Sequence, residues 1–172
     1  MKHISIILAF LMTIGSQASA ADPDDLQKLK DTGNCVKCLL TGFNLPLRDT
    51  TENYVNLDNA NLRNTSLINA NLWGASLKNA NLTNAYLINT YLPDANLNGA
   101  NLSGANLHKA QMPNSNLTGA NLSGAKLTYT NLEDANLSGA NLTDANMSYA
   151  KMNGAILCNT TMPDGSVIYS GC

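Results

Sequence analysis

The sequence has few charged and few aromatic residues. Of its 172 residues, 13% are charged and 5% aromatic, although 44% are hydrophobic. An ordinary globular domain has about 25% charged residues. Ten Lys and Arg are balanced by twelve Asp and Glu, for a formal net charge of -2. Neither sign dominates, which argues against a surface that binds nucleic acid phosphates. The hydrophobic fraction is too high for a disordered chain, and the length allows one domain.

Histidine is scarce as well, since the chain has only His3 and His108. His3 lies in a segment that we expect to be removed by cleavage. The remaining residues cannot supply a Ser-His-Asp set, a histidine-rich metal site or a zinc motif. We therefore predict that the protein is not an enzyme and has no catalytic residues, no cofactor and no metal. His108 is expected to be a solvated side chain on the outer surface.

The first twenty residues have the features of an export signal. Lys2 gives a positive start, residues 4–14 are mostly apolar, and the small residues at 18–20 fit a cleavage site. The apolar run is too short to span a bilayer, which needs about 20 apolar residues. We predict a cleaved signal peptide at 1–20 and a mature chain without a membrane anchor.

Four cysteines, Cys35, Cys38, Cys158 and Cys172, follow the predicted signal. An even number in an exported chain indicates disulfides rather than free thiols, and four cysteines allow three pairings. Cys35 and Cys38 also have the spacing of a redox dithiol, which lies at the start of a helix. Here a helix is expected to end just before Cys35. We therefore favour a structural disulfide, with a thiol-disulfide redox role as the alternative.

A repeat of five residues dominates the sequence. From Leu57 to Met162 every fifth residue is Leu or Met, giving 22 consecutive positions, of which 18 are Leu and 4 are Met. Two places before each of them, from Val55 to Thr160, a small residue recurs, and it is Ala at 16 positions. The unit reads Ala-Asn-Leu-x-x, as at residues 100–104.

A period of five fits neither an amphipathic helix nor a strand. On an α-helix, residues five apart are rotated by roughly 140° per step, so the leucines would spread over the whole surface. Only a chain that turns once per unit sends every Leu to one side. We therefore predict a coil with a narrow interior that Leu fills and Ala keeps small. Gly, Asn and Asp, which favour turns, dominate the position two places after the Leu.

This pattern resembles the pentapeptide repeat protein family over residues 55–162. The resemblance implies an all-β solenoid, namely a right-handed quadrilateral β-helix with four pentapeptides per coil and with the Leu and the small residue inward. Coils about 4.8 Å apart would give a column roughly 26 Å tall. Cys35-x-x-Cys38 and the segment from Cys158 to Ser166 further resemble exported members from cyanobacteria and the thylakoid lumen. With the predicted signal peptide, we expect export to the periplasm, the thylakoid lumen or the extracellular space.

Residues 21–54 are predicted to form an N-terminal cap. Asp22 and Pro23 favour a helix start and Gly33 a helix end, which indicates a helix at about 23–32. Leu26 and Leu29 would then cover the first coil. We expect the next repeats to be irregular and residues 46–54 to form a loop that resets the frame.

Residues 163–172 are predicted to form a C-terminal cap, in which Val167 and Cys172 keep the five-residue phase. In the column that the resemblance implies, cysteines at opposite ends are too far apart, because bridged Cα atoms lie within about 7 Å. On that basis we expect the disulfides Cys35–Cys38 and Cys158–Cys172.

Some members of the family mimic DNA, which implies a strongly acidic surface. From Asn56 to Cys172 this chain has six acidic and five basic residues. A net charge of -1 does not imitate a duplex. We therefore expect no relation to nucleic acid, either as a ligand or as the object of mimicry.

Residues twenty apart should stack on the outside of a column with twenty residues per coil. Tyr129, Tyr149 and Tyr169 would form such a tyrosine ladder. Another set of outward apolar residues should form one exposed patch over two coils, which indicates a protein-binding surface: Ile68, Trp73, Tyr86, Ile88, Tyr91 and Pro93. The alternatives are that these residues only stiffen the column, or that the N-terminal helix or the loop at 46–54 folds over them.

Together these features predict an exported, non-enzymatic solenoid that serves as a protein-binding or scaffold module. It would be a monomer or self-associate weakly, and its protein partner is not identified by the sequence. A thiol-disulfide redox protein acting through Cys35 and Cys38 is one alternative. A purely structural or stress-related envelope protein is another.

Overall fold

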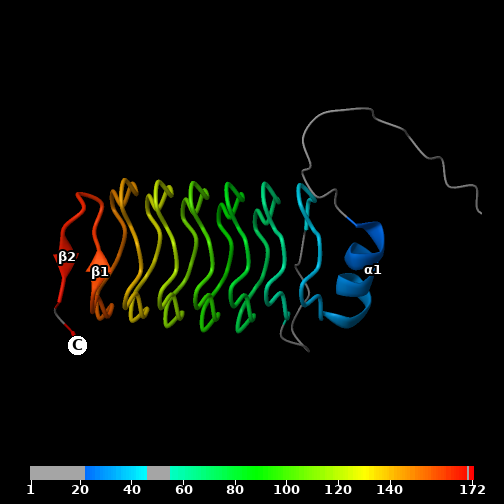
Figure 1. The fold of residues 1–172 in the computed structure, drawn as a ribbon, viewed down its shortest axis with the longest axis horizontal. Helices are drawn as coiled ribbons and strands as arrows, with labels where there is room; N and C mark the ends of the chain where they lie inside the picture. The colour runs from blue at the N-terminus through cyan, green and yellow to red at the C-terminus, as the bar shows by residue number, and fades with distance from the viewer. Residues whose placement is uncertain (1–21, 46–54, 170) are drawn as a thin grey trace, which may run out of the picture.

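The computed structural model describes residues 22–45, 55–169 and 171–172. The predicted signal peptide at 1–20 and the predicted loop at 46–54 lie outside the described residues. The described chain forms a long stack of coils (Figure 1). Helix α1 (Pro23–Thr32) lies at one end of the stack, and the short strands β1 (Thr160–Thr161) and β2 (Val167–Ile168) lie at the other.

Successive coils are joined by parallel β-bridges between residues twenty apart, from Asn56–Ser76 to Asn141–Thr161. The bridging residue is the one just before the inward Leu or Met. Its N–H donates to the preceding coil, as from Ser76 to the Val55 carbonyl at 2.9 Å. The Leu N–H donates to the following coil, as from Leu57 to the Ser76 carbonyl at 2.7 Å. Each side thus contributes a single bridge rather than a long strand.

A β-turn follows every inward Leu. The N–H three residues later donates back to the Leu carbonyl, as from Ala60 to Leu57 at 3.0 Å. The residue two places after the Leu has a positive φ throughout, from Asn59 at 59° to Asn159 at 54°. This is the conformation that a type II turn requires, and Gly and Asn adopt it at the least cost. Four such turns in every twenty residues give the coil four sides.

The core is the column of inward side chains. Every central position from Leu57 to Leu142 is buried, and so is every small residue two places before it. Where Thr replaces Ala, the buried hydroxyl donates to a carbonyl of the preceding coil. Thr90 donates to Leu67 at 2.8 Å in this way. The narrow interior therefore accepts Thr without leaving a buried polar group unpaired.

Helix α1 closes the N-terminal end of the stack. The Asp22 side chain accepts the Asp24 N–H at 2.9 Å, and Gly33 ends the helix with a φ of 64°. Leu29 is buried in the core, and Leu26 packs against it while half-buried. Among the described residues, no helix is both long and apolar enough to cross a membrane.

The first coil contains two more residues than the others. Its bridges, such as Asn34–Asn56 and Leu39–Asn61, join residues 22 apart. Our expectation of irregular first repeats is wrong for their backbone, because Leu40 donates to Asn61 at 2.9 Å as in every other coil. The extra residues fall between Leu45 and Val55 and leave the described sides of this coil regular.

The C-terminal end does not continue the coil. Strands β1 and β2 pair antiparallel, with Thr161 opposite Val167, and the Met162 N–H donates to the Ser166 carbonyl at 2.7 Å. The chain therefore reverses direction after Met162. Val167 keeps the five-residue phase, but its side chain is 42% exposed, so the column of inward residues does not extend to this position.

Candidate functional site

The outward apolar residues of two neighbouring coils lie around one edge of the column. Tyr86 lies in the middle of one side, Ile88 in the turn that follows, and Tyr91 in the middle of the next side. Ile68 lies one coil earlier at the same turn, since Asn69 donates to the Ile88 carbonyl. The exposed fractions are 38% for Ile68, 45% for Trp73, and 49% for both Tyr86 and Tyr91.

Pro93 does not belong to this exposed surface. It is buried, so the prediction that it is exposed is wrong. Trp73 lies one coil earlier, and its indole N–H donates to the Asp94 carboxylate at 3.0 Å. The indole therefore crosses the turn that contains Pro93, which accounts for the burial. We call the remaining set the apolar patch: Ile68, Trp73, Tyr86, Ile88 and Tyr91.

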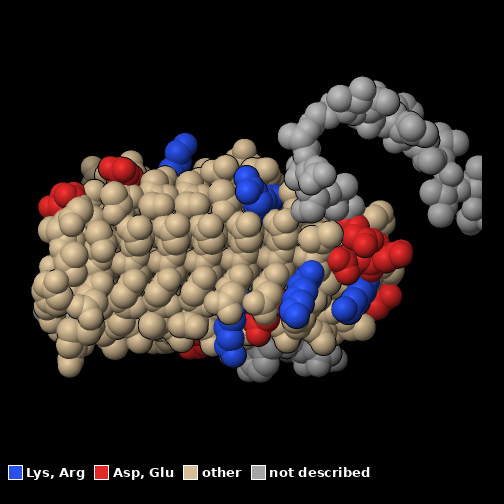
Figure 2. Space-filling model, viewed as in Figure 1, with Lys and Arg blue, Asp and Glu red and all other residues tan. Residues whose placement is uncertain are grey.

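Charged side chains are sparse along the column in the view of Figure 2. Acidic residues gather on α1, which contains Asp24, Asp25 and Asp31. This distribution gives the column no continuous charged stripe on that face. A partner would therefore meet mainly uncharged polar and apolar groups on the face that the figure displays.

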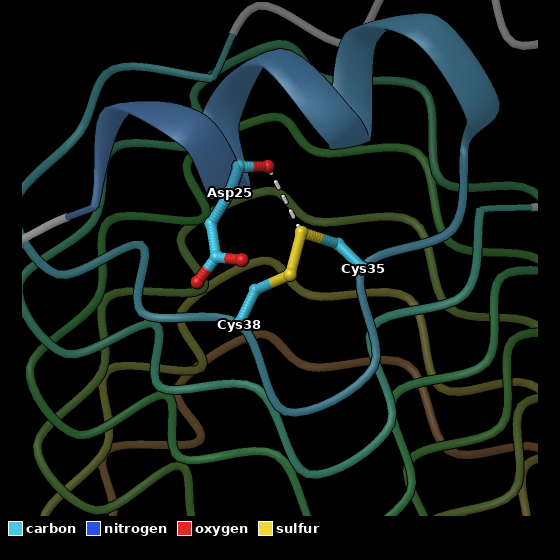
Figure 3. A group of neighbouring side chains, drawn as sticks. All are labelled: Asp25, Cys35 and Cys38. Carbon is cyan, nitrogen blue, oxygen red and sulfur yellow. Dashed lines mark hydrogen bonds between the residues drawn. A yellow bond between two sulfur atoms is a disulfide. The ribbon is translucent and has the colours of Figure 1, made fainter.

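The Cys35–Cys38 disulfide lies inside the first coil beneath α1 (Figure 3). Its two Cα atoms are 5.3 Å apart, and the residues are 0% and 1% exposed. Cys35 Sγ lies 3.1 Å from the Asp25 carbonyl oxygen. The Asp25 carboxylate accepts the Leu39 N–H at 2.7 Å. The disulfide and Asp25 together attach the helix to the first coil.

Asp25, Cys35 and Cys38 place three possible metal-ligand atoms within 4.8 Å of one another. Both sulfur atoms are joined in the disulfide, so neither is a thiolate that can bind a metal ion. Thiol-disulfide exchange requires an attacking thiolate to reach one of the sulfurs. Because α1 covers both, the geometry favours a structural disulfide.

Cys158 and Cys172 are the other pair at disulfide distance, with Cα atoms 4.9 Å apart. They are the second pair expected from the sequence. Cys158 belongs to the last coil, whereas Cys172 is exposed and follows β2. This disulfide ties the segment after the hairpin to the side of the column.

Tyr129 and Tyr149 stack with ring centroids 4.8 Å apart. Tyr169 does not join them, because the chain reverses in β2, so the prediction of a three-ring ladder is wrong for this residue. His108 meets the Tyr129 ring edge-on at 5.8 Å, and its Nδ1 lies 2.6 Å from the Thr128 hydroxyl. It is half-buried and has partners, whereas we expected a solvated side chain.

The two stacked tyrosines occupy turn positions with a positive φ, 59° at Tyr129 and 61° at Tyr149. A residue with a side chain loses roughly 1–2 kcal/mol in this conformation unless it is Asn or Asp, which adopt it more easily. The sequence contains the signal, because Tyr stands where almost every other repeat, with the exception of Lys109, has Gly, Asn or Asp. The unfavourable backbone conformation of these two tyrosines was not among the features that we expected.

Comparisons with known proteins agree with this architecture. A family model described as pentapeptide repeats (8 copies) matches residues 53–84, 80–119 and 120–159. The pentapeptide repeat protein Rfr23 from the cyanobacterium Cyanothece 51142 is 33% identical, over 77% of this chain and 92% of that chain, with a TM-score of 0.37. A search among curated proteins finds no match.

Two further solved structures come from a cyanobacterium and a plant. HetL from Nostoc sp. strain PCC 7120, which is involved in heterocyst differentiation regulation, is 24% identical over 87% of this chain and 100% of that chain, with a TM-score of 0.33. A protein from the Arabidopsis thaliana thylakoid lumen is 28% identical over 63% of this chain and 65% of that chain, with a TM-score of 0.24. Because the family model spans most of the repeat region, this chain belongs to the pentapeptide repeat family, whose fold is a right-handed β-helix solenoid.

Proposed function

We propose that the protein is exported and acts without catalysis, as a binding or scaffold module that recognises a partner protein through the apolar patch. The observation that carries this proposal is the exposure of Ile68, Trp73, Tyr86 and Tyr91, each between 38% and 49%, on two neighbouring coils. Contiguous exposed apolar surface on a soluble protein marks interaction sites. Trp and Tyr are also the residues that most often dominate binding energy at protein interfaces.

The β-bridges between coils hold the residues of this patch in a fixed arrangement. Tyr86 and Tyr91 both belong to bridges with the coil before and the coil after. The Trp73 indole is restrained by its hydrogen bond to Asp94. Side chains that are ordered before binding lose less entropy on association. A rigid apolar surface of this kind supports a scaffold, because its shape does not depend on the partner.

Two features support export. The first is the sequence of residues 1–20, with a basic start, an apolar run and a small-residue cleavage site. The second is the pair of disulfides, which persist in oxidising compartments and are rare in the cytosol. We therefore propose the periplasm, the thylakoid lumen or the extracellular space.

The two alternatives differ from this function in what they require. A redox protein needs access to Cys35 and Cys38, and the burial of both sulfurs weighs against it. A purely structural envelope protein needs no specific partner, so removal of the patch would leave its associations unchanged.

The decisive experiment compares captured partners. Tagged wild type, a Trp73→Ala/Tyr91→Ala variant and a Tyr169→Ala control are each cross-linked and purified from extracts of the source organism. Tyr169 is an exposed aromatic residue, 71% exposed, outside the patch. We expect a partner that is recovered with wild type and with the control but lost with the patch variant. Identical partner sets from all three, with unchanged circular dichroism, would contradict the role of the patch.

A further inference from the structure

We infer that Asn153 is a site of spontaneous deamidation, and that its conversion to aspartate or isoaspartate loosens the last coil. This inference goes beyond the proposed function and uses no residue of the apolar patch. The sequence contains Asn-Gly twice, at Asn98-Gly99 and at Asn153-Gly154. Asn is a thermolabile residue, and Gly has no side chain to hinder its backbone nitrogen. The contacts of the two pairs in the structure differ.

The two pairs have almost the same neighbours in sequence and the same turn. The segments read Leu-Asn-Gly-Ala at 97–100 and Met-Asn-Gly-Ala at 152–155. In both turns the Ala N–H donates to the carbonyl three residues earlier, at 3.0 and 3.1 Å, and the Asn carbonyl accepts one N–H from the preceding coil, at 2.9 Å. The φ of the glycine is 66° at Gly99 and 72° at Gly154. Any large difference in reactivity therefore comes from contacts with other parts of the chain.

Three further hydrogen bonds hold Asn98 and Gly99 in the middle of the column. The Asn98 N–H donates to the Asn96 side chain at 3.1 Å. The Asn98 side-chain amide donates to the Thr118 carbonyl of the following coil at 3.0 Å, and the Gly99 N–H donates to the same carbonyl at 2.9 Å. The side-chain amide and the backbone nitrogen that would attack it are thus both engaged.

Asn153 and Gly154 have none of these three bonds within the described residues. No coil follows them, so neither the Asn153 side chain nor the Gly154 N–H has an acceptor in the part of the chain that the structure describes. Lys151 stands where the other turn has Asn96, so the Asn153 N–H lacks the side-chain acceptor as well. Asn153 is also exposed, whereas Asn98 is half-buried.

The reaction consumes only water. The Gly154 nitrogen attacks the side-chain carbonyl carbon of Asn153 and gives its proton to the solvent. The bond between that carbon and the amide nitrogen breaks, and ammonia leaves with a proton from water, so that a succinimide ring remains. Water then opens the ring at one of its carbonyls. Opening at one carbonyl gives aspartate, and opening at the other gives isoaspartate, in which the backbone continues through the side chain. A carboxyl replaces an amide, and nothing is oxidised or reduced.

Ring closure requires the side chain and the Gly nitrogen to rotate toward each other, so the reaction proceeds from a locally opened turn. Local opening costs least where the fewest interactions are lost. One hydrogen bond changes such an equilibrium roughly 2- to 10-fold. Three missing bonds therefore predict that Asn153 reacts about tenfold or more faster than Asn98 in the native protein.

The product places a negative charge next to two carboxylates of the preceding coil. Glu133 lies twenty residues before Asn153, and the Asp134 N–H donates to the Asn153 carbonyl at 2.9 Å. The Asp134 carboxylate lies so close to Gly154 that a Cβ on this glycine would overlap it. Lys151 is the only basic residue beyond residue 126, so acidic groups outnumber basic ones at this corner. Like charges on neighbouring strands are destabilising, and isoaspartate also lengthens the backbone of the turn. Both changes loosen the last coil.

The test measures deamidation at both pairs in the same molecule. The mature, disulfide-bonded protein is incubated at mildly alkaline pH, and its peptides are analysed at intervals by mass spectrometry with isoaspartate and aspartate separated. A second sample is kept unfolded in denaturant with its disulfides reduced. We expect Asn153 to react about tenfold or more faster than Asn98 in the native protein, and the two rates to be similar after unfolding. Equal native rates, or the same rate ratio in both samples, would overturn the inference.

A substitution at Lys151 tests the role of the hydrogen bonds. Lys151→Asn supplies the acceptor that Asn96 provides in the other turn, and it should slow the reaction at Asn153 roughly 2- to 10-fold while leaving Asn98 unchanged. Lys151→Gln removes the same charge without a side chain of the right length, and it is the matched control. An unchanged rate in Lys151→Asn, or equal slowing by Gln, would contradict control of the reaction by these bonds.

Asn153→Asp reproduces the charge of the product and tests its effect on the coil. The Lys151 and Ile156 amides each donate to the preceding coil at 2.9 Å, and their hydrogen exchange should become several-fold faster than in wild type. The Lys126 amide, in an earlier coil, should exchange as before. Adding Asp134→Asn, which keeps a residue suited to the positive φ, should restore slow exchange. Unchanged exchange at Lys151 and Ile156 in Asn153→Asp would contradict the loosening.

Discussion

Tyr129 and Tyr149 stack across neighbouring coils with 11° between their ring planes, although both occupy turn positions that favour Gly or Asn. The backbone strain and the ring stacking of this pair contribute to stability with opposite signs. The positive φ costs roughly 1–2 kcal/mol for each residue, and a stacked aromatic pair contributes about 0.5–1.5 kcal/mol. The balance between them can be measured, because replacement by Asn removes the strain once per residue and the stack once per pair.

We therefore expect a non-additive result from Tyr129→Asn and Tyr149→Asn. Each single variant relieves its own strain but loses the stack, so its free energy of unfolding should change little. The double variant relieves both strains and loses the stack only once. It should exceed the sum of the single effects by about 0.5–1.5 kcal/mol, the energy of the stack. Urea unfolding of the four proteins at a concentration that keeps them monomeric gives this coupling energy.

Lys109→Asn is the control for this cycle. Lys109 lies in the same column of turns, with a φ of 58°, and has no stacked ring. Its replacement should stabilise the fold by about 1 kcal/mol through strain relief alone. Additive effects of the two tyrosine substitutions would mean that the rings do not interact in solution.

The two disulfides should differ in their resistance to reduction. Cys35 and Cys38 are buried beneath α1, whereas Cys172 is exposed. Since exchange requires access to a sulfur, we expect a mild reductant under native conditions to open Cys158–Cys172 well before Cys35–Cys38. Timed alkylation followed by peptide mass analysis measures both. Equal rates, or faster reduction of Cys35–Cys38, would restore the redox alternative.

Thr90 should be more sensitive to loss of its hydroxyl than a threonine on the outer surface. Its buried hydroxyl donates to the Leu67 carbonyl at 2.8 Å, while that carbonyl also accepts the Ala70 N–H. Thr90→Val removes the donor but leaves the carbonyl paired, so we expect a loss of about 1 kcal/mol. Thr118→Val, at an outward position, should stay within about 0.5 kcal/mol of wild type. Chemical denaturation of the two variants provides the comparison, and equal losses would argue against a role for the buried bond.

Asp164 should titrate below the ordinary range of aspartate. The Ser166 hydroxyl donates to its carboxylate at 2.6 Å and the Ser166 N–H at 2.9 Å, and these bonds lower its pKa from the usual 3.8. A lowered pKa means that the turn is supported fully above the ordinary pKa. The support is lost as the pH falls through the lowered value. Carboxyl chemical shifts followed by NMR measure this pKa.

Ser166→Ala tests the cause of that shift. It removes the largest contribution, the hydroxyl bond, and should return the pKa of Asp164 toward 3.8. A pKa that does not move in this variant would place the cause elsewhere in the turn.

The periodicity predicted the repeating architecture because every unit has the same two inward positions, a Leu or Met and a small residue two places before it. The helix bounds could be predicted from Asp22, Pro23 and Gly33, whose preferences are local. The partner of His108 could also have been found, since Thr128 lies twenty residues later in the same column. Such features are predictable because they follow from local residue preferences or from counting along the chain.

The remaining features depend on contacts that counting does not determine. A five-residue phase tells which residue would point inward if the coil continued, but not whether it continues. The chain reverses after Met162 because the Met162–Ser166 bond and Gly165, with a φ of 81°, form a hairpin. The burial of Pro93 likewise depends on the direction that the Trp73 indole takes toward Asp94.

The length of the coil also sets a direction in space. A coil takes twenty residues and each side takes five, so deletion of one unit between residues 96 and 125 would keep every Leu inward. Everything beyond the deletion would nevertheless turn by one side relative to the apolar patch. The direction in which Tyr149 faces relative to that patch therefore changes by a quarter turn for each unit that is added or removed. Only the removal of a whole coil would shorten the column without changing it.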